Sequence, residues 1–492
     1  MSEQKSLKKN TFFSFLNSFS KLFFPFITFP YASRILHAEG IGQVNFATNT
    51  VNIFSLIAGL GISSYATREA ARLRDNRFEL SKFCKEMFFI NFISMLTAYA
   101  LLFLSLLFIP KLQNYNVLIL ITSIYIFFSA IGFEWLYKAE EEFQYITIRS
   151  LIFKFIGLAF LFLFVRSEGD TIEYAIFGIF TSVTTDICNL FYTRKYIYFG
   201  IKVKLELKKH LKYIFTFFGM GLVTSLYTIF DTIMLGFLTT DVQIGYYTAA
   251  TKFNKLTVGL LTSISAILLP RLAYYLSNKE DEKFYKLFEK SLSIIIMLAV
   301  PTTIGLIVLA RPLLLLFVGQ EYEPAIIAMN TISPIIISIS IASVTGTQVL
   351  PALNKEKVSL LSYIIGAVTN VTMNLIFIPK YGALGAAIGT LVAETSVTLT
   401  QIIFLRKLIS VEVLKNFMHS IISCIPMIGI LFLINYFISN NLINIILSVS
   451  LSVLIYLLFL ILLRNKYCIE YIHFFADKIK TKFRKENKSN EE

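Results

Sequence analysis

Runs of roughly 20 apolar residues recur along almost the whole chain, separated by short charged segments. A helix of that length crosses the hydrocarbon core of a bilayer, which is about 30 Å thick. A transmembrane β-barrel would instead show alternating segments of about ten residues. The sequence therefore predicts an all-α polytopic membrane protein. We expect fourteen transmembrane helices, at residues 10–33, 41–64, 87–109, 117–137, 150–165, 173–193, 213–236, 244–268, 291–310, 323–350, 358–378, 383–405, 416–436 and 442–463. The segment 311–324 is alternatively a partly re-entrant loop.

Basic residues are distributed unevenly between the segments that join these spans. If the N-terminus is cytoplasmic, the cytoplasmic segments hold 36 of the 45 lysines and arginines, and the opposite loops hold 5. The positive-inside rule then predicts that both termini are cytoplasmic. The net charge of +14 is explained by this topology, so we expect membrane lipids as partners and no nucleic acid.

Two parts of the chain match at a constant offset of 203 residues, because Ile41 and Gly42 correspond to Ile244 and Gly245. Six predicted spans precede the basic segment 194–212, and six more lie between it and the basic pair Arg406 and Lys407, so the halves would share one orientation, as in parallel-repeat transporters. We expect four parts: an N-lobe at 1–200, a C-lobe at 201–407, two further helices within 408–466, and a basic amphipathic cytoplasmic tail at 467–492. The tail would lie on the inner leaflet, or be disordered from Lys485 onward.

The second and eighth spans each carry a polar face, at positions that correspond under this offset. These positions are Asn45, Asn49 and Asn52 in the second span, and Thr248, Lys252 and Lys255 in the eighth. The spacing places each set on one side of a helix. A cation in hydrocarbon is costly unless it faces a cavity or a partner. We interpret both faces as lining a shared central cavity. The alternatives are that the lysines snorkel to the headgroups or form an internal ion pair.

Two basic residues of the first span are further candidates for substrate binding. Lys21 lies mid-span, and the prolines at positions 25 and 30 that follow it can kink the helix and shape a cavity. Lys21 either faces the cavity or is a structural lysine paired with a carboxylate. Arg34 lies at the outer mouth, where it contacts either substrate or outer headgroups.

Intramembrane carboxylates are candidates for coupling transport to an ion gradient. Asp231 lies near the outer end of the seventh span, and Lys252 follows on the next helix. The two form either an ion pair that opens during transport or a static pair that holds a helix hairpin. Glu394 lies near the middle of the twelfth span, where it either carries a proton or has a hydrogen-bonded structural role. For Asp186 and Glu134 we expect structural roles.

Several classes of enzyme are disfavoured by the motifs. The chain has no Walker A motif, no HExxH and no GxSxG, and its short outer loops leave no room for a catalytic domain. The four cysteines are far apart, which argues against a disulfide framework or a metal site. We expect no catalytic residue, no metal and no cofactor, with a proton or sodium gradient as the energy source.

The chain resembles the Wzx-type polysaccharide flippases, the oligosaccharide-lipid exporters related to the MATE transporters. The resemblance covers essentially the whole chain. It depends on residues 30–36 (PYASRIL), 60–72 (LGISSYATREAAR), 134–141 (EWLYKAEE), 231–236 (DTIMLG) and 245–252 (GYYTAATK). It implies a MATE-like fold of two six-helix lobes around a central cavity, with two appended helices and transport by alternating access.

The resemblance also implies a substrate, an oligosaccharide linked to undecaprenyl diphosphate, which is moved across the bacterial inner membrane for O-antigen biosynthesis. The lysines of the eighth span, Lys21 and Arg34 would hold the diphosphate, and the asparagines and Thr248 would contact sugar hydroxyls. This chain has mostly lysine where relatives keep cations, so transfer of roles residue by residue is weakened. Polysaccharide polymerases are possible partners. The alternatives are a cation-coupled MATE-type small-molecule exporter and a lipid II flippase.

Overall fold

The computed structural model describes residues 7–198, 200–266, 269–470 and 472, and across these residues the regular structure is helical without strands. The chain forms two compact units. The first comprises Met1–Thr248 and Val371–Ala386, and the second comprises Ala249–Asn370 and Ala387–Glu492. The lobe boundaries expected from the repeat remain a prediction. Most of the expected tail, at 473–492, lies outside the described residues.

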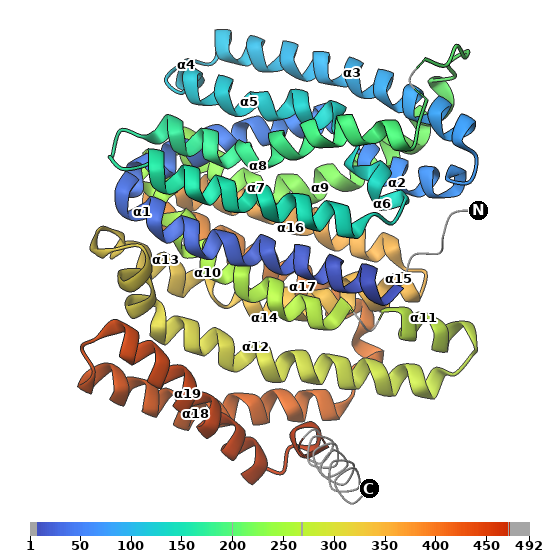
Figure 1. The fold of residues 1–492 in the computed structure, drawn as a ribbon. Helices are drawn as coiled ribbons and strands as arrows, with labels where there is room; N and C mark the ends of the chain where they lie inside the picture. Colours follow the sequence, from blue (N-terminus) through green and yellow to red (C-terminus); the bar gives the residue numbers. More distant parts are fainter. Residues whose placement is uncertain (1–6, 199, 267–268, 471, 473–492) are drawn as a thin grey trace, which may run out of the picture. The chain divides into compact units, whose positions relative to one another are not determined.

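Nine helices belong entirely to the described part of the first unit (Figure 1). They are α1 (Leu7–Gly59), α2 (Ile62–Leu73), α3 (Arg77–Phe108), α4 (Pro110–Gln113), α5 (Asn116–Ile131), α6 (Glu134–Ala139), α7 (Phe143–Phe164), α8 (Thr171–Tyr192) and α9 (Lys208–Leu238). Three more helices contribute residues to both units: α10 (Asp241–Ala266), α16 (Glu356–Tyr381) and α17 (Ala383–Leu405).

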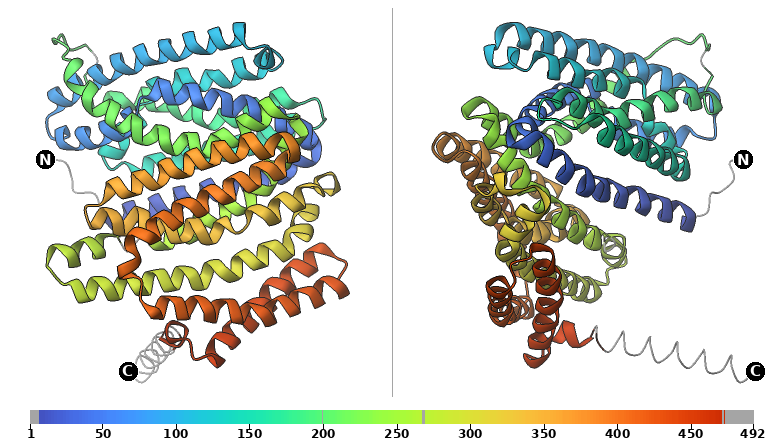
Figure 2. Two further views of the ribbon diagram at one scale, coloured as in Figure 1. Left: turned by 180° about the vertical axis from the view of Figure 1, so that it is seen from behind. Right: turned by 60° about the vertical axis from the view of Figure 1, so that its left-hand side comes forward.

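The second unit contains seven further α-helices among its described residues. They are α11 (Leu269–Ser277), α12 (Asp281–Phe317), α13 (Ala325–Ile332), α14 (Ile335–Val344), α15 (Leu350–Ala352), α18 (Val411–Phe437) and, as the last, α19 (Asn441–Leu462), with α15 only one short turn. Figure 2 shows the same ribbon from two further sides. A π-helical turn, Thr345–Val349, connects α14 to α15. The segment after Arg311 stays helical to Phe317 and closes in a short turn at Gln320–Tyr322, so it is not a re-entrant loop.

The predicted spans agree with these helices. Over its described residues, each predicted span overlaps one α-helix or two consecutive α-helices, except the tenth, 323–350, which covers α13, α14, the π-helical turn and the start of α15. Ten helices in the described part of the chain are long and apolar enough to cross a membrane, and the first of them, Lys9–Leu73, contains both of the first two spans. The prediction of an all-α, multi-pass membrane protein is therefore confirmed.

The first two spans are separated by a sharp backbone break at His37. This residue has φ 56° and ψ −176°, which no α-helical residue adopts, so α1 changes direction there. His37 Nε2 lies 3.0 Å from Glu168 Oε1 in the segment before α8. Tyr31 donates a hydrogen bond to the carbonyl oxygen of Val165 at 2.9 Å, which ties the end of the first span before the break to the end of α7.

Two glycines bring α1 and α10 into backbone contact within the first unit. A Cβ atom at Gly42 would lie 1.9 Å from the carbonyl oxygen of Asp241, and one at Gly245 would lie 2.1 Å from the carbonyl oxygen of Ala38. Neither position therefore has room for a side chain. Residues 38 and 241 are themselves related by the offset of 203, as are the two glycines. Gly42 lies against Asp241, which is the repeat equivalent of Ala38, and Gly245 lies against Ala38 itself. The contact therefore has an internal two-fold relationship.

Side chains of α3 hold the linker between α8 and α9 along their own helix. Tyr198 N donates to Ser81 Oγ at 2.9 Å, Lys85 Nζ donates to the carbonyl oxygen of Ile201 at 2.9 Å, and Glu206 N donates to Glu86 Oε1 at 2.9 Å. The linker that joins the two predicted lobes is therefore fixed to the first unit.

A buried polar cluster continues from this linker into α9. Glu86 and His210 are almost fully buried, and Glu86 Oε2 lies 2.8 Å from His210 Nε2. The other ring nitrogen, Nδ1, lies 2.7 Å from the hydroxyl of Tyr65 on α2, and Lys209 Nζ lies 3.5 Å from Glu86 Oε2. Since each buried polar group has a partner, the cluster joins α2, α3 and α9 without leaving an unmet hydrogen bond at their contact.

Candidate functional site

The predicted polar face of the second span lies in the part of α1 that follows the break at His37. Asn45 Nδ2 donates to the carbonyl oxygen of Ile41 at 2.7 Å, and Asn49 Nδ2 donates to that of Asn45 at 2.9 Å. Both side chains and that of Asn52 are half-buried. Each of these bonds to the preceding turn uses one of the two amide N–H groups of its asparagine.

The predicted polar face of the eighth span lies on α10. Thr248 is buried and is the last residue of this segment in the first unit, whereas Lys252 and Lys255 belong to the second unit. Lys252 is half-buried and Lys255 is exposed. That these lysines share a cavity with the asparagines of α1 remains a prediction.

The basic residues of the first span are both exposed on α1. Lys21 follows Ser20, whose hydroxyl accepts a hydrogen bond from Lys154 Nζ of α7 at 2.7 Å. The ammonium of Lys154 also lies 5.7 Å from the ring centre of Phe24. Two lysines are thus brought to neighbouring positions on α1 and α7. Lys154 was not among the predicted site residues, because an isolated lysine in an apolar run gives no indication of its neighbour.

Asp231 is the centre of a buried network that joins three helices of the first unit. Tyr247 of α10 donates to Asp231 Oδ2 at 2.5 Å, and Asn374 of α16 donates its amide to Asp231 Oδ1 at 2.7 Å. Each of the two carboxylate oxygens therefore accepts a hydrogen bond from a neighbouring helix. An ion pair between Asp231 and Lys252 remains a prediction. Asn374 was not predicted, since 143 residues separate it from Asp231.

The second candidate for coupling, Glu394, is buried on α17 in the second unit. One turn further along, the hydroxyl of Thr398 donates to the carbonyl oxygen of Ser338 at 2.8 Å. Gln401 then accepts from Thr345 at 2.7 Å and donates to Ser362 at 2.9 Å. The face of α17 that carries Glu394 is therefore a line of buried polar groups, which is rare in a membrane helix unless it has a role in packing or transport.

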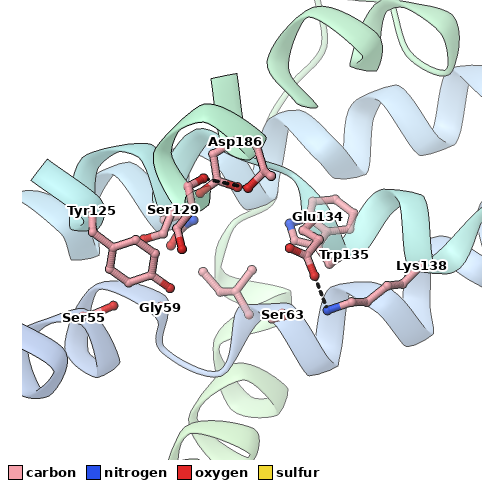
Figure 3. A pocket seen from close by; sticks show the side chains of 13 residues that line it. Ser55, Gly59, Ser63, Tyr125, Ser129, Glu134, Trp135, Lys138 and Asp186 are labelled. Carbon is pink, nitrogen blue, oxygen red and sulfur yellow. Dashed lines mark hydrogen bonds and ion pairs between the residues drawn. The ribbon is translucent and has the colours of Figure 1, made fainter. Parts of the chain in front are cut away.

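A polar cavity of about 330 Å³ lies within the first unit (Figure 3). Residues of α1, α2, α3, α5, α6 and α8 line it, and one of them is Gly59, the last residue of α1. Glu134 and Lys138 form an ion pair across one turn of α6 at 2.8 Å. Asp186 of α8 is buried, and its Oδ1 would lie 2.2 Å from a Cβ at Gly132, so only glycine there admits the carboxylate. The sequence had suggested only structural roles for both acids, because nothing in the sequence places α6 beside α8.

Metal binding has no support in the described residues, where no cluster of three or more histidine, cysteine or acidic side chains is positioned to hold an ion. All four cysteines are free thiols.

Membrane-length helices, buried charged networks and a polar cavity inside a helical unit together define a class of protein, the polytopic helical membrane transporters. The family described as "Polysaccharide biosynthesis protein" matches residues 7–276, more than half of the chain, and the chain belongs to this family. The family described as MatE matches residues 217–376. The resemblance to Wzx-type flippases of the MATE-related superfamily is thereby confirmed.

Individual relatives agree with this assignment. A Shigella dysenteriae protein named for O-antigen transport is 29% identical over 402 residues, which are 80% of this chain and 98% of that protein. A protein of the same name from Escherichia coli (strain K12) is 25% identical over 408 residues, which are 82% and 97% of the two chains. Both are named as transporters, so the expectation that the chain is not an enzyme is confirmed.

The fold also matches a solved structure. The lipid II flippase MurJ, in its inward closed conformation, superposes with a TM-score of 0.73 over 93% of this chain and 99% of that one, at 19% sequence identity. At this identity the likeness shows the fold alone.

Proposed function

We propose that the chain is a flippase that moves oligosaccharide repeat units linked to undecaprenyl diphosphate across the bacterial inner membrane. The observation that carries this proposal is the family match, together with two relatives named for O-antigen transport that are covered over nearly their whole length. Membrane lipids surround the protein, and both termini face the cytoplasm. A polysaccharide polymerase is the partner that would receive the exported unit.

Alternating access between the two leaflets is the transport mechanism that we propose. The parallel repeat supports it, because two similar lobes in one orientation can rock about a shared axis. The close contact of α1 with α10 at Gly42 and Gly245 supports a fixed pivot, since packing without side chains leaves little room for sliding.

The diphosphate of the carrier lipid is proposed to bind cationic side chains in a central cavity. Lys252 and Lys255 lie on one face of α10, and Lys21 lies near Lys154 on α1 and α7. A lysine ammonium is a compact point charge suited to phosphate. Arg34 would assist at the outer mouth. Asn45, Asn49, Asn52 and Thr248 would contact the first sugar.

Transport is proposed to be driven by a proton or sodium gradient through Asp231 and Glu394. Asp231 supports this because its carboxylate is buried and joins three helices through hydrogen bonds from Tyr247 and Asn374. Glu394 supports it through its burial.

The double variant Lys252→Ala with Lys255→Ala tests the proposal. In a host whose surface glycan depends on this chain, we expect the variant to reduce surface glycan at least tenfold and to leave lipid-linked units on the inner leaflet. A matched control is Lys283→Ala with Lys286→Ala, because these lysines have the same spacing but are paired with Glu280 and Glu282 at an exposed site. Normal export in the first variant would contradict the cationic site. Normal export in cells without the chain would contradict the flippase function itself.

The alternative is a MATE-type exporter of small cations, and the carboxylates of the cavity in the first unit are the observation that favours it. Cells that express the chain would then resist cationic dyes and extrude them. The flippase proposal expects no change in dye retention.

A further inference from the structure

The cavity of the first unit is lined by hydroxyls, an amide, two carboxylates and one ammonium. The hydroxyl of Ser129 already donates to the carbonyl oxygen of Ile126 at 3.0 Å, and that of Thr185 donates to the carbonyl oxygen of Ser182 at 2.8 Å. Each hydroxyl has one hydrogen, so both present only lone pairs to the cavity. A ligand with hydroxyl groups could donate to these oxygens and to the carboxylates.

Two nearly buried polar side chains line the cavity. Asn91 of α3 is 8% exposed and donates its amide to the carbonyl oxygen of Ala130 at 2.8 Å. Asp186 of α8 is 7% exposed, and its carboxylate is an acceptor held by the fold at the cavity wall.

The size and charge of the cavity limit the chemical classes of ligand that fit it. Its volume of about 330 Å³ is within the range of small-molecule sites, about 300–1,000 Å³. The lining carries two carboxylates, Glu134 and Asp186, and one ammonium, Lys138. This excess of carboxylates on the lining disfavours a diphosphate or a uronic acid. Trp135 supplies an apolar wall beside these polar groups.

We infer that this cavity is a sugar subsite for a neutral or amino sugar of the transported glycan, distinct from the cations proposed for the diphosphate. The inference depends on the proposed function for its source of sugar. Sugar hydroxyls would donate to Asp186 and Glu134, and the apolar face of the ring would lie against Trp135. Charge-assisted bonds to the carboxylates would give most of the selectivity.

The chain contains a single tryptophan, and it lines this cavity, so its fluorescence reports on the proposed site without a label. The full chain is reconstituted in nanodiscs and titrated with glucose, N-acetylglucosamine, glucosamine and glucuronate, and with sodium chloride against choline chloride. Saturation-transfer NMR on the same samples detects bound sugar directly. We expect a saturable response to the neutral and amino sugars with a Kd on the order of 1 mM, at least tenfold weaker binding of glucuronate, and no saturable response to sodium.

Two matched glycine variants locate the binding. A Cβ at Gly59 meets no atom within 4 Å and enters the cavity lining, and a Cβ at Gly178 of α8 likewise meets none but lies outside it. Gly59→Leu should abolish both signals, and Gly178→Leu should keep them. Asp186→Asn should weaken binding roughly tenfold while the size-exclusion profile stays monodisperse. If Gly59→Leu does not give a monodisperse protein, Asp186→Asn decides the test.

Several outcomes would overturn the subsite. They are the absence of a saturable signal for any sugar by both methods, undiminished binding in Gly59→Leu or Asp186→Asn, equal binding of glucuronate, and a response to sodium alone. Wild-type chain that flips lipid-linked glycan without binding sugar would refute the subsite and leave the proposed function standing. Chain that binds sugar but flips nothing would refute the proposed function.

Discussion

Gly42 of α1 and Gly245 of α10 occupy equivalent places in the repeat, and each lies against the backbone of the other's helix. The carbonyl oxygens that they approach, at Asp241 and Ala38, are also equivalent. The offset of 203 residues seen in the sequence is thus visible as a reciprocal contact in three dimensions. A random similarity between two helix starts would give no such exchange of partners.

The first prediction concerns these glycines. Gly42→Ala should destabilise the protein by about 1–3 kcal/mol, because the new Cβ would lie 1.9 Å from a carbonyl oxygen and the helices would have to separate. The melting temperature of the detergent-solubilised chain is the measurement. Gly178→Ala is the control, since a Cβ there meets no atom within 4 Å. Equal melting temperatures for the two variants would show that α1 and α10 are not in backbone contact.

The second prediction separates the charge of Asp231 from its hydrogen bonds. Asp231→Asn removes the charge, whereas Tyr247→Phe removes one donor and keeps both the carboxylate and its bond from Asn374. If Asp231 couples transport to a gradient, the asparagine variant should lose the response of glycan flipping to proton and sodium gradients in membrane vesicles. The phenylalanine variant should retain it. An unchanged gradient response of Asp231→Asn would remove this residue from the coupling mechanism.

The third prediction concerns Glu394, the other coupling candidate. Glu394→Gln keeps the shape of the side chain and removes its charge, so a coupling role predicts an altered gradient response with unchanged protein level. A structural role predicts the reverse, a lower melting temperature with gradient dependence intact. Measurement of both quantities on the same vesicles distinguishes the two.

The fourth prediction concerns the buried cluster at the start of α9. Glu86→Gln weakens the contacts to His210 and Lys209, and loss of bonds to a charged group typically costs about 1.5–3 kcal/mol. The linker should then be released more often, and trypsin should cut faster at Lys202 and Lys204. Glu79→Gln, at an exposed position on the same helix, is the control. Cleavage at the wild-type rate in Glu86→Gln would mean that the cluster does not hold the linker.

Much of the fold follows from the sequence, because lipid restricts a long apolar run to a helix. The break at His37 falls between the first two predicted spans, outside the apolar runs that lipid holds in a helix. The re-entrant alternative after Arg311 was wrong, since the helix tolerates Pro312 and continues to Phe317.

The candidate site could be predicted only in part. Regular spacing identified the asparagines of α1 and the lysines of α10, whose shared cavity is still a prediction. The cavity between α6 and α8 was missed, because Glu134 and Asp186 are 52 residues apart and only the packing of their helices brings them to the same space. The hydrogen bond from Asn374 to Asp231 was missed for the same reason, because 143 residues separate the two and only the packing of their helices brings them together. Tertiary proximity of single polar residues leaves no periodic signal in one sequence.

The attachment of the linker to α3 has a consequence for expressing the protein in pieces. A break in the chain after residue 203 would leave Tyr198 and Ile201 on the first piece and Glu206 and His210 on the second. All four residues form hydrogen bonds with side chains of α3. The new ends would therefore be anchored to neighbouring turns of one helix. Two separately translated halves should then reassemble without a covalent connection.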